Sequence, residues 1–308
     1  MRQNETQGLC IRAPKPESVA GTDGFIIVAV LWILAALAML AAVYADFVAK
    51  TAVAARVYDS RLQSEALIAA GLELTAYRLL GYDDASRQTS GAFDFQLGLS
   101  HVGVEFRSEG ARIDLNLAPK ELLSGLCRVL GAKPEEADSY ADRIVAWRTK
   151  PGPGNQNPEA EAYKSAGLNY GPRQAPFQNV AELRLVRDLP AVLVESALPF
   201  VTVFNGQAGI DVTVAAPQVV RTLPGINPNL VDEIITRGAQ NPQAVLPLLG
   251  AAGPSVAVGG RKAARALVHI TLDTGRQVNA DAVLLITENN SAEPYRVLAW
   301  HDDFDGPV

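Results

Sequence analysis

The sequence predicts an α+β fold: one long N-terminal helix packs on a small antiparallel sheet, and a large helical domain is inserted between the strands. Residues 25–45 form an apolar stretch without charge, Gly or Pro, and helical character continues to about residue 80. Residues 120–148 also have helical character, and three runs after residue 265 are rich in β-branched and aromatic residues. This order of helix, strands, helices and strands gives the fold class.

Composition limits the function before any motif is considered. The chain has 308 residues, of which 48% are hydrophobic, and its formal net charge is -6 with a sequence pI near 5.2. These values predict a folded protein and disfavour a nucleic-acid binder, because duplex affinity comes largely from Lys and Arg. Cys10 and Cys127 lie far apart and outside any zinc-ligand pattern, so we expect Cys127 to be a buried free thiol.

The N-terminal helix is predicted to anchor the chain in a membrane. Residues 25–45 are long enough to cross a hydrocarbon core of roughly 30 Å. The helix continues through residues 46–80 without a break, unlike the short apolar run of a removable signal peptide. In this polar half, an apolar stripe is expected to face the soluble domain. It comprises Phe47, Val48, Ala52, Ala55, Leu62, Ala66, Ala69, Ala70, Leu74 and Tyr77.

Between the long helix and residue 201 the pattern changes several times. Residues 81–96 read as a loop, and two strands are expected at 101–108 and 111–118. Helices are expected at 120–131 and 134–148, the second beginning at a proline, and they form a hairpin. The remaining segments are a loop at 149–160, little regular structure at 160–178, a helix at 179–187 capped by Asn179, and a helix at 191–201.

A short motif occurs twice, about a hundred residues apart. Residues 113–119 align with residues 210–217, with an Ile-Asp pair at the start and an Ala-Pro pair at the end of each copy. Each copy is expected to lead a short strand into a helix. The second copy continues through a tight turn at Gly225, and the chain ends with strands at 266–274, 277–288 and 295–303.

The ordered features resemble the K-type minor pseudopilin family of bacterial type II secretion over nearly the whole chain. They are a hydrophilic leader ending at Gly24, a helix headed by Phe25, the motif IDLNLAP, the run RIVAWR, the segment EAYKSAGLNYGPRQAPFQNVAEL, and the repeat IDVTVAAP with LPGI. Most pseudopilins have Glu at the fifth residue after the leader, where this chain has Ala29. K-type subunits characteristically lack that Glu.

The resemblance implies a domain organisation and a cellular location. Residues 1–24 would be a prepilin-type leader, 25–45 the membrane-spanning half of the helix, and 46–80 its periplasmic half. Residues 81–116 and 208–308 would form a pilin-like α/β domain with a helical hairpin, and residues 117–207 an inserted helical domain. The chain would be a single-pass protein of the bacterial inner membrane, with its C-terminal domain in the periplasm.

The resemblance also implies partners and a role. A prepilin peptidase would cut between Gly24 and Phe25. The chain would sit at the tip of the pseudopilus, start fibre assembly with I-type and J-type minor pseudopilins on the inner-membrane secretion platform, and support export of folded proteins. Its membrane helix is expected to pack on partner helices, since small residues allow close approach. The expected assembly residues are Ala29, Trp32, Ala35, Ala36, Ala38, Ala41 and Ala42.

Members of this family can bind calcium in the inserted domain. In this chain Ala146 and Thr149 replace acidic positions, whereas Glu159 and Glu161 remain as candidate ligands. Calcium usually takes six or more oxygen ligands, including several carboxylates, so no strong calcium site and no other cofactor is expected.

Two other classes of function remain to be weighed. Residues 223–238, LPGINPNLVDEIITRG, resemble a helix-hairpin-helix, which makes a signal-anchored periplasmic nucleic-acid-binding protein the alternative. Asp232 and Glu233 and the acidic net charge count against it. An enzyme is not expected, since His101, His269 and His301 lack a nucleophile context and no GxSxG, HExxH or phosphate-loop motif is present.

Overall fold

The computed structural model describes residues 23–82, 86–152, 158–257, 262–287 and 293–303. It divides into two compact units, residues 1–61 and 62–308. The predicted leader lies outside the described residues, apart from Asp23 and Gly24, which begin the first helix.

The predicted long helix is confirmed as α1, Asp23–Leu80. Its part in the first unit is long enough and apolar enough to cross a membrane. A signal sequence near the N-terminus would have the same length and composition. Its part in the second unit packs on the sheet through one face. The buried residues of that face are Ser64, Leu67, Ile68, Gly71, Leu72, Thr75, Ala76 and Leu79. Several of them are small, and a Cβ at Gly71 would lie 3.2 Å from Val104, so the helix lies close to the strands.

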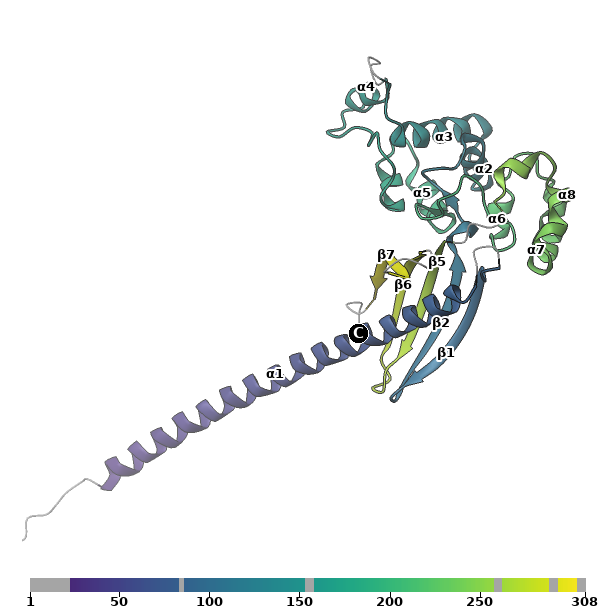
Figure 1. Ribbon diagram of the computed structural model, residues 1–308. Helices are drawn as coiled ribbons and strands as arrows, with labels where there is room; N and C mark the ends of the chain where they lie inside the picture. The colour runs from purple at the N-terminus through teal and green to yellow at the C-terminus, as the bar shows by residue number, and fades with distance from the viewer. Residues whose placement is uncertain (1–22, 83–85, 153–157, 258–261, 288–292, 304–308) are drawn as a thin grey trace, which may run out of the picture. The chain divides into compact units, whose positions relative to one another are not determined.

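Five antiparallel strands form the main sheet in the order β1-β2-β5-β6-β7. Their bounds are Ser90–Leu97, Ser100–Ser108, Ala263–Thr271, Gln277–Ile286 and Tyr295–Asp302. Alternate residues of β2 and β5 are buried beneath α1, which Figure 1 shows lying along one face. The three C-terminal strands and the strand at 101–108 are confirmed. The predicted loop at 81–96 is wrong in part, because residues 90–97 pair with β2 as an edge strand.

All other elements lie between β2 and β5. They are η1 Glu109–Ala111, β3 Ile113–Asp114, α2 Lys120–Val129, α3 Pro134–Arg148, α4 Pro158–Ser165, η2 Val180–Leu185, α5 Ala191–Ala197, η3 Leu198–Phe200, β4 Val201–Thr202, α6 Pro217–Val220, η4 Pro228–Leu230, α7 Val231–Gln240, η5 Pro242–Val245, α8 Leu246–Leu249 and η6 Gly250–Ser255. The sheet therefore carries one long helical insertion, which Figure 1 shows beyond the ends of β2 and β5.

The helical hairpin of α2 and α3 is confirmed, whereas four neighbouring predictions need correction. The strand at 111–118 is only two residues long and pairs with β4 instead of joining the main sheet. Residues 180–185 form a 3-10 helix, although Asn179 does accept the capping bond from the backbone N–H of Ala181 at 2.8 Å. The helix predicted at 191–201 gives way to η3 and β4, because Pro199 interrupts it. Residues 158–165 form a helix where little regular structure was expected.

The two copies of the repeated motif have the same local structure. Ile113 pairs in parallel with Val201, and Ile210 pairs in parallel with Val256. The following aspartate in each copy accepts a bond from the backbone two residues later, at 2.7 Å in the first copy and 3.0 Å in the second. A helix then begins at or directly after the proline, and the expected strand-to-helix passage is confirmed.

Two large hydrophobic cores and one small cluster, formed by Cys127, Ala137 and Leu193, lie in the second unit. One lies between α1 and the main sheet. The other is continuous from Ile113 to Ala252 and includes α2, α3, α6 and α7. Residues 210–252 therefore share one core with residues 117–207. The predicted domain organisation places these two ranges in different domains. Cys127 is buried and free, as expected.

Candidate assembly surface and polar clusters

The predicted assembly residues of the membrane helix lie on two different faces. Helical periodicity places Ala35, Ala38, Ala41 and Ala42 on one face of α1, whereas Ala29 and Ala36 lie on the opposite face. Phe25 and Trp32 are highly exposed. Small residues therefore allow other helices to approach residues 29–42 of α1 closely on two opposite faces.

In the second unit, the stripe predicted to face the soluble domain is wrong. Leu62, Ala66, Ala69 and Tyr77 share a face of α1 that points away from the sheet, and the side chain of Tyr77 is 76% exposed. The predicted stripe is apolar at helical spacing, but the face that packs on the sheet is a different one. That face includes the small residues Ser64, Gly71 and Ala76. Glu73 lies on the same face as the stripe, between Ala69 and Tyr77, and accepts a hydrogen bond from the hydroxyl of Tyr295 at 2.7 Å, so the stripe face is apolar at these four positions and not throughout. We call these four residues the outer stripe.

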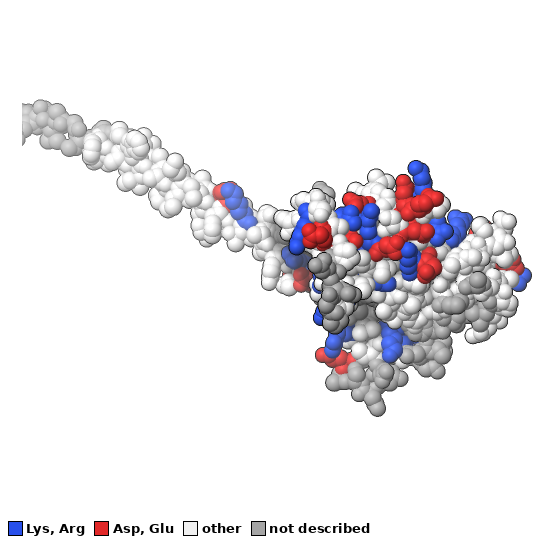
Figure 2. Space-filling model, turned by 90° about the horizontal axis from the view of Figure 1, so that it is seen from above, with Lys and Arg blue, Asp and Glu red and all other residues white. Residues whose placement is uncertain are grey.

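Charged side chains follow a different distribution. Residues 25–45 contain none, and Figure 2 shows this part of α1 as uncoloured surface. The ion pair of Asp46 and Lys50, 2.8 Å apart, marks the end of the uncharged stretch. Figure 2 also shows Lys, Arg, Asp and Glu side chains of both signs gathered over the second unit. This contrast fits an apolar environment for residues 25–45 and water for the rest.

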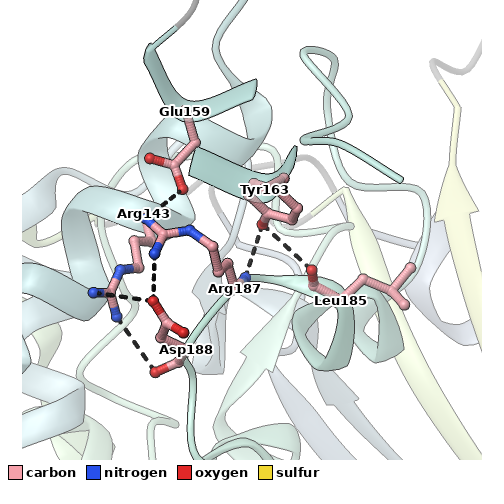
Figure 3. Close-up of polar contacts among 6 residues, drawn as sticks. All are labelled: Arg143, Glu159, Tyr163, Leu185, Arg187 and Asp188. Carbon is pink, nitrogen blue, oxygen red and sulfur yellow. Dashed lines mark hydrogen bonds and ion pairs between the residues drawn. The ribbon is translucent and has the colours of Figure 1, made fainter. Parts of the chain in front are cut away.

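The candidate calcium ligands are held by different partners. Glu159 lies 3.4 Å from the guanidinium of Arg187, which also pairs with Asp188 (Figure 3). Glu161 lies 3.8 Å from Lys164 on the exposed side of α4. The two glutamates are two residues apart on one helix, so they point in different directions. Among the described residues, no group of three His, Cys, Asp or Glu is arranged to hold a metal ion.

Tyr163 links α4 to the segment that follows η2. Its hydroxyl accepts a hydrogen bond from the backbone N–H of Arg187 at 2.8 Å and donates to the carbonyl of Leu185 at 3.3 Å (Figure 3). Arg143 of α3 adds a hydrogen bond to the carbonyl of Asp188 at 3.3 Å. Burial raises the pKa of Tyr163 to about 12, so the phenol stays protonated at neutral pH. These contacts connect α3 and α4 to the segment that follows η2.

The runs RIVAWR and EAYKSAGLNYGPRQAPFQNVAEL come together in the helical core. Trp147 packs on Tyr163 at 6.0 Å and on Phe177 at 6.2 Å between ring centroids. The backbone N–H of Phe177 donates to the side-chain oxygen of Asn116 at 2.6 Å, which ties the loop to the first repeat copy. The role of these runs is thus structural, and the sequence had shown only that they belong to one pattern.

The possible nucleic-acid hairpin is built around Gly225, whose φ is 73°. Asn227 accepts a bond from the backbone N–H of Asn229, and α7 follows. Arg237 is paired with Glu233 at 2.6 Å. This pairing reduces the positive charge that the hairpin can offer to phosphate, so the geometry gives the nucleic-acid alternative no added support.

Two comparisons find similarity to proteins of type II secretion. Residues 108–206 match the family described as Type II secretion system (T2SS), protein K. The structure is similar to a chain of the GspK-GspI-GspJ complex from the enterotoxigenic Escherichia coli Type 2 Secretion System, with a TM-score of 0.57 and 15% identity, over 78% of this chain and 94% of that chain. At this identity the structural likeness shows a shared fold. No curated protein sequence matches the chain.

Proposed function

We propose that the chain, whose residues 108–206 match the family of type II secretion system protein K, is the minor pseudopilin at the tip of the pseudopilus. In this role it starts fibre assembly together with I-type and J-type minor pseudopilins on the inner-membrane platform. The assembled fibre then supports export of folded proteins across the outer membrane.

The observation that carries this proposal is the outer stripe of α1. Leu62, Ala66, Ala69 and Tyr77 are apolar, at helical spacing, and exposed although the same helix buries its opposite face on the sheet. An apolar helix face of this kind is completed by another helix, and alanines permit a close crossing. The solved complex that contains the structurally similar chain is named as GspK-GspI-GspJ. We therefore take I-type and J-type subunits as the source of the partner helices.

Two features support the tip position. Ala29 stands where a carboxylate would neutralise the terminal amine of a neighbouring subunit, and an unpaired buried charge is costly. A subunit with no neighbour above it has no such amine to neutralise. In addition, the insertion between β2 and β5 places a helical mass of about half the chain beyond the sheet, where it would obstruct a further subunit.

The proposed processing and location follow from the same helix. A prepilin peptidase removes residues 1–24, so that Phe25 becomes the N-terminus, and residues 25–45 anchor the chain in the inner membrane with the second unit in the periplasm. N-terminal sequencing of the full chain expressed with and without a prepilin peptidase tests this step. A chain that keeps residues 1–24 under both conditions would contradict it.

Assembly is tested by introducing a charge on the outer stripe. Full-length Leu62→Glu and Ala66→Glu variants are co-expressed with tagged I-type and J-type pseudopilins and extracted in detergent. Co-purification is expected to fall roughly tenfold, because the partner helix would have to bury an unpaired carboxylate. Leu99→Glu is the matched control, since Leu99 is 87% exposed in the turn between β1 and β2 and should leave the complex intact.

The three variants also separate the assembly surface from general folding. Leu62, Ala66 and Leu99 are all exposed, so none of the substitutions should lower the unfolding temperature appreciably. Undiminished co-purification of the Leu62→Glu and Ala66→Glu variants would show that partner helices do not use this face. Equal loss in the Leu99→Glu variant would mean that added negative charge alone disrupts the complex.

A further inference from the structure

Strand β1 is the outermost strand of the main sheet, and Figure 1 shows it at the border of the sheet. It pairs with β2 in one unbroken antiparallel register along its eight residues. The same register places Thr89 opposite Ser108, and the backbone N–H of Ser108 donates to the carbonyl of Thr89 at 2.6 Å. Because hydrogen-bonded pairs alternate along an antiparallel ladder, residues 91, 93, 95 and 97 also bond to β2. The backbone groups of the alternate residues point away from the sheet, and we call them the free edge: Ser90, Ala92, Asp94 and Gln96.

No residue that the structure describes pairs with the free edge. Its four residues are all exposed, and within the described ranges their outward backbone N–H and C=O groups form no hydrogen bond. Such a row of donors and acceptors is a template on which another extended chain can pair.

The other border of the sheet, β7, is protected against such pairing. Its register with β6 is shifted by an irregularity, and it carries Arg296, His301 and Asp302. Bulges and charged side chains are the usual means by which border strands avoid an added strand. In β1 the register is regular, and Asp94 is the one charged residue in its sequence. The two borders therefore differ, and β1 is the one suited to accept a strand.

The side chains of β1 that point toward α1 are apolar. Phe93 and Phe95 are half-buried at the rim of the core between α1 and the sheet, and their ring centroids are 6.4 Å apart. The guanidinium of Arg78 lies 4.1 Å from the centroid of the Phe93 ring. An added strand would place every second side chain beside these rings, because successive residues of a strand alternate between faces. Apolar residues at those positions would complete the core at this border.

The opposite face of the same border is acidic. Asp94 of β1 and Glu105 of β2 are diagonal neighbours, and the residues directly opposite them, Gly103 and Ala92, are small. Both carboxylates are exposed, and neither forms a hydrogen bond or an ion pair with a residue that the structure describes. Arg107 lies on this face one residue pair further along and, among the described residues, is paired with neither of them. A cation on an added strand beside Asp94 would therefore offset the repulsion between the two carboxylates.

We propose that the free edge binds an extended segment of a partner protein, which joins the main sheet as an added antiparallel strand. The segment carries Lys or Arg beside Asp94 on one face and apolar residues beside Phe93 and Phe95 on the other. Its antiparallel direction follows the other strands, since every neighbouring pair in the main sheet is antiparallel. The free edge contains no residue of the outer stripe, so this proposal and the proposed tip function can fail separately.

The test is a titration of two fluorescein-labelled peptides, TVKVKVT and TVEVEVT, with the full-length chain in detergent, followed by fluorescence anisotropy. Both peptides alternate apolar and polar residues and read the same in either direction, so they differ only in the sign of their charge. The lysine peptide is expected to bind roughly tenfold more tightly than the glutamate peptide, because like charges on adjacent strands destabilise the pairing.

Methylation of the peptide backbone tests hydrogen bonding to the free edge. In an antiparallel added strand, the residues that share a face with Asp94 are those whose N–H groups point to β1. N-methylation of both lysines removes these donors and should weaken binding at least about tenfold. N-methylation of the first and last valines is the matched control. Their N–H groups point away from β1, so binding should weaken by less than about threefold.

Charge reversal on the chain assigns the preference to β1. Asp94→Lys is expected to reverse the order, so that the glutamate peptide binds more tightly. The matched control is Asp273→Lys, which makes the same charge change at an exposed carboxylate in the turn between β5 and β6 and should keep the preference for lysine. Asp94 and Asp273 are both exposed, so neither variant should lower the unfolding temperature appreciably.

Four outcomes would overturn the proposal. Absence of binding by either peptide up to about 1 mM would show that the free edge does not accept a strand. Equal binding of the two methylated lysine peptides would exclude backbone pairing. A preference for lysine that persists in Asp94→Lys would place the binding elsewhere on the chain. An equal change in Asp94→Lys and Asp273→Lys would show that the preference follows only the net charge.

Discussion

The two copies of the repeated motif begin alike and then differ. In the first copy, the helix that starts after Pro119 continues for ten residues as α2. In the second, α6 has only four residues, because Pro224 and Gly225 occupy the positions that correspond to Leu126 and Cys127. The shared Ile-Asp and Ala-Pro pairs thus fix where a helix begins, whereas the next Pro or Gly fixes where it ends.

The copies are also held in place differently. Arg148 of α3 donates to the carbonyls of Leu115 and Ala118, the latter at 2.6 Å, and so holds the first copy by a side chain. Both copies are also held by backbone bonds, such as the bond from Leu115 N–H to the Thr202 carbonyl at 2.8 Å in the first and the bond from Asp211 N–H to the Gly110 carbonyl at 2.7 Å in the second. The guanidinium clamp of Arg148 is the added contact of the first copy. Similar turns therefore resist mutation for different reasons, and this difference can be tested.

The largest effect is expected where the two copies touch. A Cβ on Gly125 of α2 would lie 2.2 Å from the carbonyl oxygen of Thr222, which is backbone and cannot move aside cheaply. Gly125→Ala should therefore destabilise the chain by about 3 kcal/mol, despite the better helix propensity of Ala. Urea unfolding of the full-length protein in detergent, followed by tryptophan fluorescence, measures this change.

Gly238→Ala is the control for that prediction. Gly238 lies in α7 after the second copy, and a Cβ there would be 3.5 Å from its nearest neighbour, an ordinary contact. The substitution should stabilise the chain by about 0.5–1 kcal/mol through helix propensity. If both variants shift stability in the same direction, the close packing of α2 on Thr222 is not what distinguishes the copies.

The next effect concerns the side chain that holds only the first copy. Arg148→Met should cost about 2 kcal/mol, because it leaves two partly buried carbonyls without their charged donor. Burial lowers the pKa of Arg148, in agreement with a guanidinium inside the fold. Arg221→Met changes an exposed arginine at the end of α6 and should alter stability by less than about 0.5 kcal/mol. Comparable losses in both variants would remove the distinction.

A pH effect is expected at the aspartate of the first copy. Burial raises the pKa of Asp114 above its usual 3.8, so the folded chain keeps this proton to higher pH than the unfolded chain does. Its favourable contribution is therefore complete below the unfolded pKa and is lost as pH rises through the folded pKa. Asp114→Asn cannot titrate, so its stability relative to the original chain should increase with pH above about 3.8.

Unfolding free energies of both proteins from pH 3 to 7 measure that difference. A difference that stays constant over this range would show that the carboxyl of Asp114 has the same pKa in the folded and unfolded chains. A difference that falls with pH would show that its two hydrogen bonds, from the backbone N–H groups of Asn116 and Gly206, outweigh burial.

Sequence periodicity predicted the elements whose pattern is local. The long helix, the α2–α3 hairpin and the C-terminal strands are of this kind. It missed β1 because residues 90–97 are flanked by Gly and Ser and become a strand only by pairing with β2. It also chose the wrong face of α1. The buried face contains Ser64, Gly71 and Thr75, which rank low in hydrophobicity but allow close contact with the sheet.

The candidate site was predictable only where it is one continuous segment. The apolar membrane helix is of that kind, and so are its exposed alanines. The ion pair of Glu109 with Arg265 was not predictable, because it requires η1 and β5 to meet although the two residues are more than 150 positions apart in sequence. The same holds for the pairing of Glu159 with Arg187, which no local pattern indicated.

The smallest expected effect is a difference between the two copies in the rate of local opening, measured by cysteine labelling. Cys127 of α2 corresponds to Gly225 in the exposed turn of the second copy. Burial raises the pKa of the Cys127 thiol to about 11, and its side chain is only 4% exposed. In a Cys10→Ala background, a maleimide at pH 7 should therefore label Cys127 only when the first copy opens, and much more slowly than a cysteine placed at Asn229 with Cys127→Ala. The ratio of the two rates gives the free energy of opening α2. Equal rates would mean that the side-chain clamp of the first copy adds no local rigidity beyond that of the turn at Gly225.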